Sequence, residues 1–195
     1  MSNKPLLVLA STSRYRKMVL AKLGIPFETA NPDADETSLE GESAFDLVKR
    51  LSELKARAVA SDFPQALIIG SDQVAVLNET ILGKPGTHEN AFAQLKSLSG
   101  NTVIFYTGLC LLNSSTGKCQ LDVIEYKVNF RPLTNEMIEH YLMQDKPYDS
   151  AGSFKSEGLG IALFESIVGE DPNALIGLPL IRLVSMLEKE HFSVL

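Results

Sequence analysis

The sequence is poor in cysteine and histidine and lacks two common nucleotide-binding patterns. Its two cysteines, Cys110 and Cys119, are too few for a disulfide framework and have no CxxC spacing, so we expect both to be buried, reduced thiols. The three histidines show no metal-ligand spacing. There is no GxxxxGK(S/T) motif and no complete GxGxxG motif. These absences exclude a disulfide-stapled fold, a Walker-type phosphate loop and a dinucleotide fingerprint.

Long apolar runs and an excess of positive charge are also lacking. No apolar run approaches the length of a membrane-spanning helix. The short apolar run at 6–9 continues directly into a helical pattern, unlike a signal peptide, so we expect a cytoplasmic protein with no membrane partner. The net charge of −6 disfavours a general nucleic-acid binder. The length of 195 residues suits one large domain or two tightly joined lobes.

Strand and helix patterns alternate in the first part of the chain, and the middle reads as an antiparallel ribbon. The expected elements are a strand at 6–10, a helix ending at Gly24, a strand at 25–29, a helix at about 44–60, a strand at 67–76, a helix from Thr87 to Gly100, strands at 102–113 and 119–130, a helix from Thr134 to about Met143, short strands within 148–173 and a helix at about 178–190. This order predicts an α/β fold with a mixed sheet, arranged as two lobes around a cleft.

A cluster of cations marks the start of the first expected helix. Arg14, Arg16 and Lys17 follow the polar stretch Ser11–Ser13. A helix N-terminus already carries positive partial charge, so cations are unfavourable there unless an anion binds. Free backbone N–H groups, hydroxyls and cations together make a seat for phosphate. A solvated basic face at small energetic cost is an equally good interpretation of these residues alone.

A second group of residues supplies carboxylates. Asp72 lies within the apolar strand and needs a cation, a metal or a hydrogen-bond donor if it is buried. The acidic loop at 33–36 adds carboxylates, which Mg²⁺ prefers as ligands. Lys55 and Lys84 are lysines, which lie at the protein surface more often than they bind a ligand. The pattern at 152–158 predicts a polar loop that contains glycine. These residues favour metal-dependent chemistry on a polyphosphate.

Several short motifs together resemble the Maf family of nucleoside triphosphate pyrophosphatases in order and spacing. They are LASTSRYR at 9–16, DET at 35–37, GSDQV at 70–74, GKP at 83–85, AGSFKSEG at 151–158 and GLPL at 177–180. The resemblance implies a single domain over 1–195 with the inosine triphosphate pyrophosphatase-like fold. That fold is an elongated mixed sheet flanked by helices, with a nucleotide cleft between two lobes. It also implies cleavage between the α and β phosphates with Mg²⁺ or Mn²⁺, and a homodimer.

The resemblance assigns roles residue by residue. Asp72 matches the catalytic proton acceptor, and with Glu36 it would hold the metal. Lys55 matches a position at the triphosphate, where it would take part in catalysis. The residues expected to bind the triphosphate are Ser11, Arg16 and Lys84. The family often has proline where this chain has Arg14, so the phosphate contact is assigned to Arg16.

Three further positions distinguish branches of the family. Tyr15, Gln73 and Glu157 differ from the Arg, Thr and Gln of the branch that acts on dTTP and UTP, and resemble the YceF-type branch, which prefers 7-methyl-GTP. Tyr15 could stack on the cationic base, and Glu157 could accept hydrogen bonds from the guanine edge. Gln73 could contact base or sugar. The same chemistry on dTTP, UTP or another modified nucleotide, and a nucleotide-binding regulator without activity, remain alternatives.

Overall fold

The computed structural model describes residues 4–195, which form five α-helices, seven strands and two short 3₁₀ helices. In chain order these are β1 (Leu6–Ala10), α1 (Arg14–Ala21), β2 (Glu28–Ala30), α2 (Ala44–Ala58), β3 (Ala66–Leu77), β4 (Thr80–Leu82), α3 (His88–Leu98), β5 (Thr102–Asn113), β6 (Cys119–Phe130), α4 (Asn135–Asp145), η1 (Ala151–Ser153), η2 (Leu159–Leu163), β7 (Phe164–Val168) and α5 (Leu180–Lys189). Within this described part of the chain, every helix is too short or too polar to cross a membrane.

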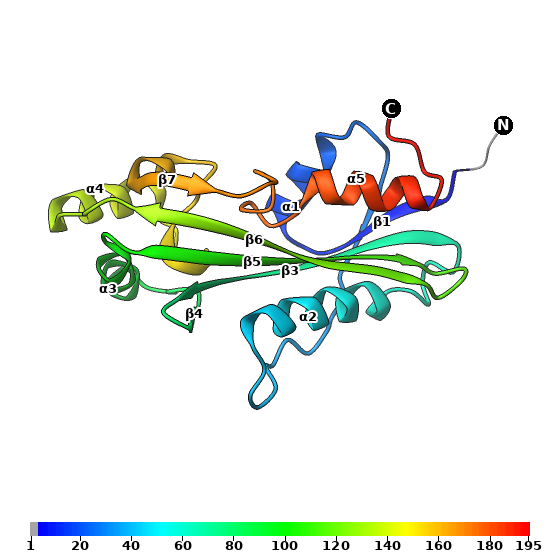
Figure 1. The fold of residues 1–195 in the computed structure, drawn as a ribbon, viewed down its shortest axis with the longest axis horizontal. Coiled ribbons are helices and arrows are strands. Elements are labelled where there is room, and N and C mark those ends of the chain that lie inside the picture. The colour runs from blue at the N-terminus through cyan, green and yellow to red at the C-terminus, as the bar shows by residue number, and fades with distance from the viewer. Residues whose placement is uncertain (1–3) are drawn as a thin grey trace. The chain divides into compact units, whose positions relative to one another are not determined.

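The strands join in one mixed sheet, which confirms the predicted α/β class (Figure 1). The strand order is β2-β1-β3-β5-β6-β7, with β4 paired to β3. β1 is parallel to both β2 and β3, whereas β3–β4 and β6–β7 are antiparallel. β2 begins later than the strand predicted at 25–29. The reason is that Pro26 cannot donate to a ladder, and Ile25 and Phe27 pack against the core as loop side chains instead.

The chain divides into two compact units. The first unit holds the residues up to Gln73, Thr107–Ile124 and the residues from Asp171 onward. The second holds Val74–Tyr106 and Glu125–Glu170. The candidate site described below is built from the first unit.

Side chains that alternate along the strands of the first unit form two cores. Leu67 and Ile69 of β3 belong to a cluster that includes residues of α1 and α5, such as Leu20 and Leu183. Ile68 belongs to a second cluster with residues of α2. Successive strand residues point to opposite faces, so even-numbered residues of β3 face α2 and odd-numbered ones face away from it. This alternation decides where the polar residues at 71–73 point.

Helix α2 lies unusually close to the sheet because two glycines leave room for it. A Cβ atom on Gly70 would lie 2.0 Å from the carbonyl oxygen of Ser52, and one on Gly108 would lie 2.3 Å from that of Val48. Both obstacles are backbone atoms of the helix, which cannot move aside singly. The close approach lets short side chains on the inner face of α2 reach the backbone of β3.

Replacing Gly70 with alanine is therefore expected to destabilise the fold by about 3 kcal/mol, because the added methyl group forces α2 away from the sheet. Urea unfolding would measure the change. Gly83→Ala is the matched control, since a Cβ atom at Gly83 meets no atom within 4 Å. Equal stability of the two variants would contradict this account of the packing of α2.

Candidate functional site

The candidate site lies where the parallel strands of the first unit end. The last paired residues of β1 and β3 are Leu9 and Ile69, so β3 continues beyond the end of its parallel neighbour. Helix α1 starts at this edge, directly after β1, and the acidic loop follows β2. In open α/β sheets the crevice at the carboxyl ends of the strands is where ligands bind.

Asp72 and Lys55 form a buried ion pair at this edge. Asp72 faces α2 because it is an even-numbered residue of β3, and its Oδ1 lies 2.6 Å from the Nζ of Lys55. Asp72 is 7% exposed and Lys55 5%. The prediction that Asp72 needs a cationic or donor partner is confirmed. The interpretation of Lys55 as a surface residue is wrong: Lys55 lies one helical turn after Leu51, on the same inward face of α2.

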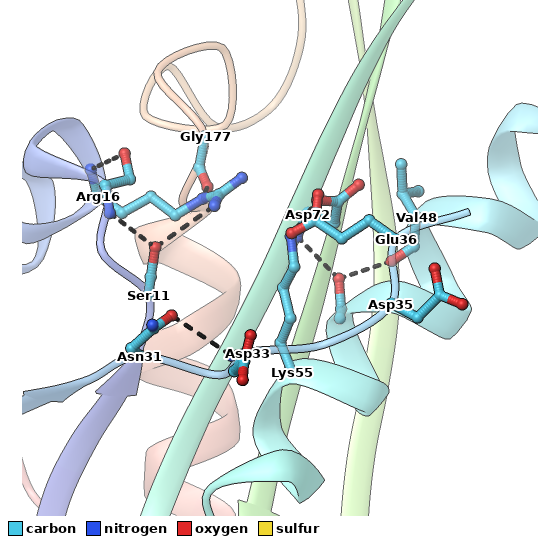
Figure 2. Close-up of polar contacts among 12 residues, drawn as sticks. Ser11, Arg16, Asn31, Asp33, Asp35, Glu36, Val48, Lys55, Asp72 and Gly177 are labelled. Atoms are coloured by element: carbon cyan, nitrogen blue, oxygen red, sulfur yellow. Dashed lines mark hydrogen bonds and ion pairs between the residues drawn. The ribbon is translucent and has the colours of Figure 1, made fainter. Parts of the chain in front are cut away.

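Glu36 joins this pair from the acidic loop. Its Oε1 lies 2.8 Å from the Nζ of Lys55, and its side chain is 59% exposed. Figure 2 shows Glu36, Lys55 and Asp72 converging, with Lys55 rising from α2. One ammonium group thus holds two carboxylates, one buried and one accessible.

A clamp on α2 holds the loop that carries Glu36. Arg50 donates through Nη2 to the carbonyl oxygen of Thr37 at 3.0 Å and through Nε to Glu42 at 2.6 Å. Glu42 also accepts from the amide of Leu39 at 3.0 Å. The loop is therefore anchored one residue after Glu36, which fixes where that carboxylate lies.

The clamp has a predictable response to acid. Hydrogen bonds from Arg50 and from the Leu39 amide lower the pKa of Glu42 from its ordinary 4.5 to about 2. Because the folded pKa is the lower one, the clamp contributes fully above pH 4.5 and its contribution is lost as the pH falls through about 2. The stability difference between wild type and Arg50→Gln should stay constant down to about pH 5 and shrink below it. Urea unfolding at a series of pH values checks this, and a difference that grew in acid would contradict it.

Ser52 positions Asp72, although the sequence did not lead us to expect a role for it. Its hydroxyl donates to the carbonyl oxygen of Val48 at 2.6 Å and accepts from the backbone N–H of Asp72 at 3.0 Å. Ser52 is fully buried on the inner face of α2. A serine among apolar residues on a helix face is the signal that could have found it, because a buried hydroxyl needs partners.

Arg16 turns from α1 toward these carboxylates. The helix is capped by Ser13, which accepts from the backbone N–H of Arg16 at 3.4 Å. The Arg16 side chain donates through Nε to the carbonyl oxygen of Gly177 at 3.0 Å and lies 3.5 Å through Nη1 from the buried hydroxyl of Ser11. Burial lowers the pKa of Arg16, and the charges of Asp72 and Glu36 oppose that shift. Arg16 therefore shares one electrostatic environment with the Asp72–Lys55 pair (Figure 2).

Arg14 and Tyr15 form a separate contact. Nη2 of Arg14 donates to the Tyr15 hydroxyl at 2.6 Å, and the guanidinium lies over the Tyr15 ring at 4.7 Å from its centroid. The cation beside the Tyr15 ring is thus the neighbouring Arg14, and stacking of Tyr15 on a cationic base stays a prediction.

Gln73 points away from α2, as expected for an odd-numbered residue of β3. Its Nε2 donates to the hydroxyl of Thr107 at 2.9 Å and to the carbonyl oxygens of Ala174 at 2.7 Å and Leu175 at 3.2 Å. Ser71, also on this face, donates to the carbonyl oxygen of Gly177 at 2.9 Å. One loop, residues 171–179, therefore supplies at least one acceptor to each of Arg16, Ser71 and Gln73.

Lys84 and Glu157 belong to the second unit. Lys84 is exposed in the loop between β4 and α3, which is held by the Gly86 N–H donating to the carbonyl oxygen of Tyr148 at 3.0 Å. Glu157 is exposed between η1 and η2. The roles of both residues stay predictions.

The carboxylates of the site suit a metal ion that is also coordinated by the phosphates of a substrate. Arg16 and Lys55 carry two positive charges and Asp72 and Glu36 two negative ones, so a polyphosphate bound here requires further cations. Among residues 4–195 there is no cluster of three or more His, Cys, Asp or Glu that could hold a metal by itself. Mg²⁺ usually takes one or two carboxylates and completes its coordination with water and substrate phosphates. Asp72 and Glu36 suit that arrangement, since a carboxylate can accept at both oxygens.

The sequence matches the family described as Maf-like protein over residues 6–190. Three similar proteins are each named 7-methyl-GTP pyrophosphatase. The one from Nitrosococcus oceani is 56% identical over 191 residues, covering 98% of this chain and 96% of the relative. The one from Pseudomonas fluorescens is 58% identical over 184 residues, covering 94% and 96%. The one from Vibrio vulnificus is 53% identical over 189 residues, covering 97% of each.

A solved structure has a similar fold. The Ham1 protein of Staphylococcus aureus aligns with a TM-score of 0.51 at 14% identity, covering 94% of this chain and 98% of that one. This likeness confirms the predicted fold class and carries no information about substrate.

Proposed function

Because this chain belongs to the Maf family, we propose that it is a nucleoside triphosphate pyrophosphatase that hydrolyses 7-methyl-GTP to 7-methyl-GMP and pyrophosphate. The observation that carries the proposal is the buried Asp72–Lys55 pair, 2.6 Å apart, with Glu36 at 2.8 Å from the same ammonium. It occurs in a chain that is 53% to 58% identical, over nearly its full length, to enzymes named for this activity.

Arg16, Ser11, Lys55 and Lys84 bind the triphosphate in this proposal. Arg16 and Lys55 are preorganised by their contacts to Gly177 and Asp72, so they meet the developing phosphate charge with little rearrangement. Ser11 and the N-terminal N–H groups of α1 add neutral donors at the same edge. Positioning and charge stabilisation account for most of the catalysis of phosphoryl transfer.

Asp72 accepts the proton of the attacking water. The pair with Lys55 involves Oδ1 of Asp72, so the second carboxylate oxygen, Oδ2, is left to accept the proton. The water attacks the α phosphorus, the bond from that phosphorus to the bridging oxygen breaks, and pyrophosphate leaves. Asp72 and Glu36 would hold Mg²⁺ or Mn²⁺, which when bound neutralises charge on the phosphates.

Tyr15, Gln73 and Glu157 select the base. The ring of Tyr15 stacks with the Arg14 guanidinium, and a base made cationic by N7-methylation suits the same kind of contact. Glu157 brings an anionic acceptor for donors on the guanine edge. Replacing these side chains by the other branch's residues should weaken the preference for 7-methyl-GTP.

The products test the proposal. Phosphorus NMR of 7-methyl-GTP incubated with the protein and Mg²⁺ should show pyrophosphate and 7-methyl-GMP, and chelation by EDTA should stop the reaction. Inorganic phosphate and a diphosphate would mean cleavage at the wrong bond. Tight binding without products would indicate a nucleotide-binding regulator and overturn the proposal.

Two further parts of the proposal concern the state of the protein. We propose a homodimer, following the family, and light scattering on the purified protein would measure its mass. We also propose a cytoplasmic location, because two cysteines without CxxC spacing are too few for the disulfide framework that small secreted proteins commonly carry. Fractionation of cells that express the protein would test it.

A further inference from the structure

The carboxamide of Gln73 is held in one orientation. Every contact of its Nε2 is to an acceptor: the carbonyl oxygens of Ala174 and Leu175 and the hydroxyl of Thr107. Turning the carboxamide over would place its own carbonyl oxygen against two backbone carbonyls, which repel it. The nitrogen therefore points into the protein, and the atom left for a ligand is Oε1, which only accepts hydrogen bonds.

The hydroxyl of Thr107 is fixed in its accepting role. Thr107 is fully buried on β5. Its single O–H hydrogen is used in donating to the carbonyl oxygen of Ala174 at 2.9 Å. The lone pairs of the hydroxyl are then directed to the N–H of Gln73. Thr107 thus links the strand to the loop and to Gln73 at once.

The loop that supplies the carbonyls is itself rigid. Asp171, 3% exposed, accepts from the N–H of Asn173 at 3.0 Å and from the N–H of Ile181 at 2.6 Å. The N–H of Ala174 donates to the Asp171 carbonyl oxygen at 2.9 Å. The loop is thereby tied to the first turn of α5, so the carbonyl oxygen of Ala174 has a defined position.

We propose that Thr107 is a positioning residue for base selection: it fixes the Gln73 carboxamide so that Oε1 accepts from the hydrogen-bond donors of a guanine-type base. This rests on the proposed function and extends it. Guanine presents two adjacent donors on its pairing edge, N1–H and the 2-amino group. A base with a carbonyl in place of the amino group would meet Oε1 with another acceptor, and a buried mismatch of that kind is costly.

Two substitutions of Thr107 test the proposal. Thr107→Val keeps the shape but removes the hydroxyl, so the specificity constant ratio of 7-methyl-GTP to UTP should fall about fivefold, through KM more than kcat. Thr107→Ser restores the hydroxyl and should keep the wild-type ratio. Thr102→Val, the same change elsewhere on β5, is the control. An unchanged ratio in Thr107→Val, or an equal fall in Thr107→Ser, would overturn the proposal.

A comparison of substrates on the wild-type protein tests the acceptor role without relying on a buried substitution. GTP should be preferred to inosine triphosphate, which lacks the amino group, and both to xanthosine triphosphate, which has a carbonyl there. Gln73→Leu should weaken this order, and the part that remains is the part that Glu157 contributes. Equal rates on the three would overturn the inference while leaving the pyrophosphatase activity standing. Failure of the wild type to release pyrophosphate from any nucleotide would overturn the proposed function, and the inference with it.

Discussion

Replacing Asp72 with asparagine is expected to lower kcat on 7-methyl-GTP by about 10²- to 10⁴-fold. The amide has the same shape, but it cannot take a proton from water and is a poorer ligand for a divalent ion. The fold should persist, because asparagine can still accept a hydrogen bond from Lys55 and its backbone N–H still donates to Ser52. Steady-state pyrophosphate release and circular dichroism measure the two effects.

Asp62→Asn is the matched control for that variant, since Asp62 is exposed in the turn between α2 and β3. It should retain wild-type turnover. Near-normal activity of Asp72→Asn would show that Asp72 is not the base, and would leave Glu36 as the remaining candidate carboxylate beside Lys55.

Replacing Lys55 with methionine is expected to have the second largest effect. It leaves Asp72 buried without its cation, and removing one partner of a buried ion pair costs about 3–5 kcal/mol of unfolding free energy. Turnover should also fall, because the cation nearest to the carboxylates is lost from the phosphate site. Urea unfolding and pyrophosphate release measure both, with Lys49→Met, an exposed change on the same helix, as the control.

The double variant Lys55→Met/Asp72→Asn separates the energy of the ion pair from the loss of side-chain packing in the free energy of unfolding. Once Asp72 is neutral, the missing ammonium matters less, so the double variant should be more stable than the sum of the single losses predicts. Strict additivity would mean that the two side chains, 2.6 Å apart, do not interact energetically.

The spacing of apolar residues predicted most of the helices and strands, because each element buries one or both of its faces. Both long strands of the ribbon, β5 and β6, were predicted with their observed bounds. The sequence also indicated that Asp72 needs a partner, because an unpaired carboxylate inside an apolar strand is unfavourable. The start of β2 was predicted at Ile25 but lies at Glu28. Ile25 and Phe27 alternate with Pro26 as apolar residues do in a strand, but Pro26 has no N–H to donate to a neighbouring strand.

The contacts that organise the site could not be predicted, because they join segments far apart in the chain. The residue type alone favoured a surface position for Lys55, and only the family resemblance assigned it to the triphosphate; its pairing with Asp72 depends on the helix face that it occupies. Ser52 left only the weak signal of a serine on an apolar helix face. Thr107 and the carbonyl oxygen of Gly177 left none, because their partners are distant in the sequence. Cys119 is only partly buried, whereas burial was expected for both cysteines.

The ratio of specificity constants for 7-methyl-GTP and for dTTP or UTP, measured on the wild-type protein with Mg²⁺, tests the central claim most directly. We expect clear preference for 7-methyl-GTP, by about tenfold or more, because selection by Tyr15, Gln73 and Glu157 involves several contacts of about 1 kcal/mol each. Preference for dTTP or UTP would contradict the assignment of these residues as selectors of a methylated guanine.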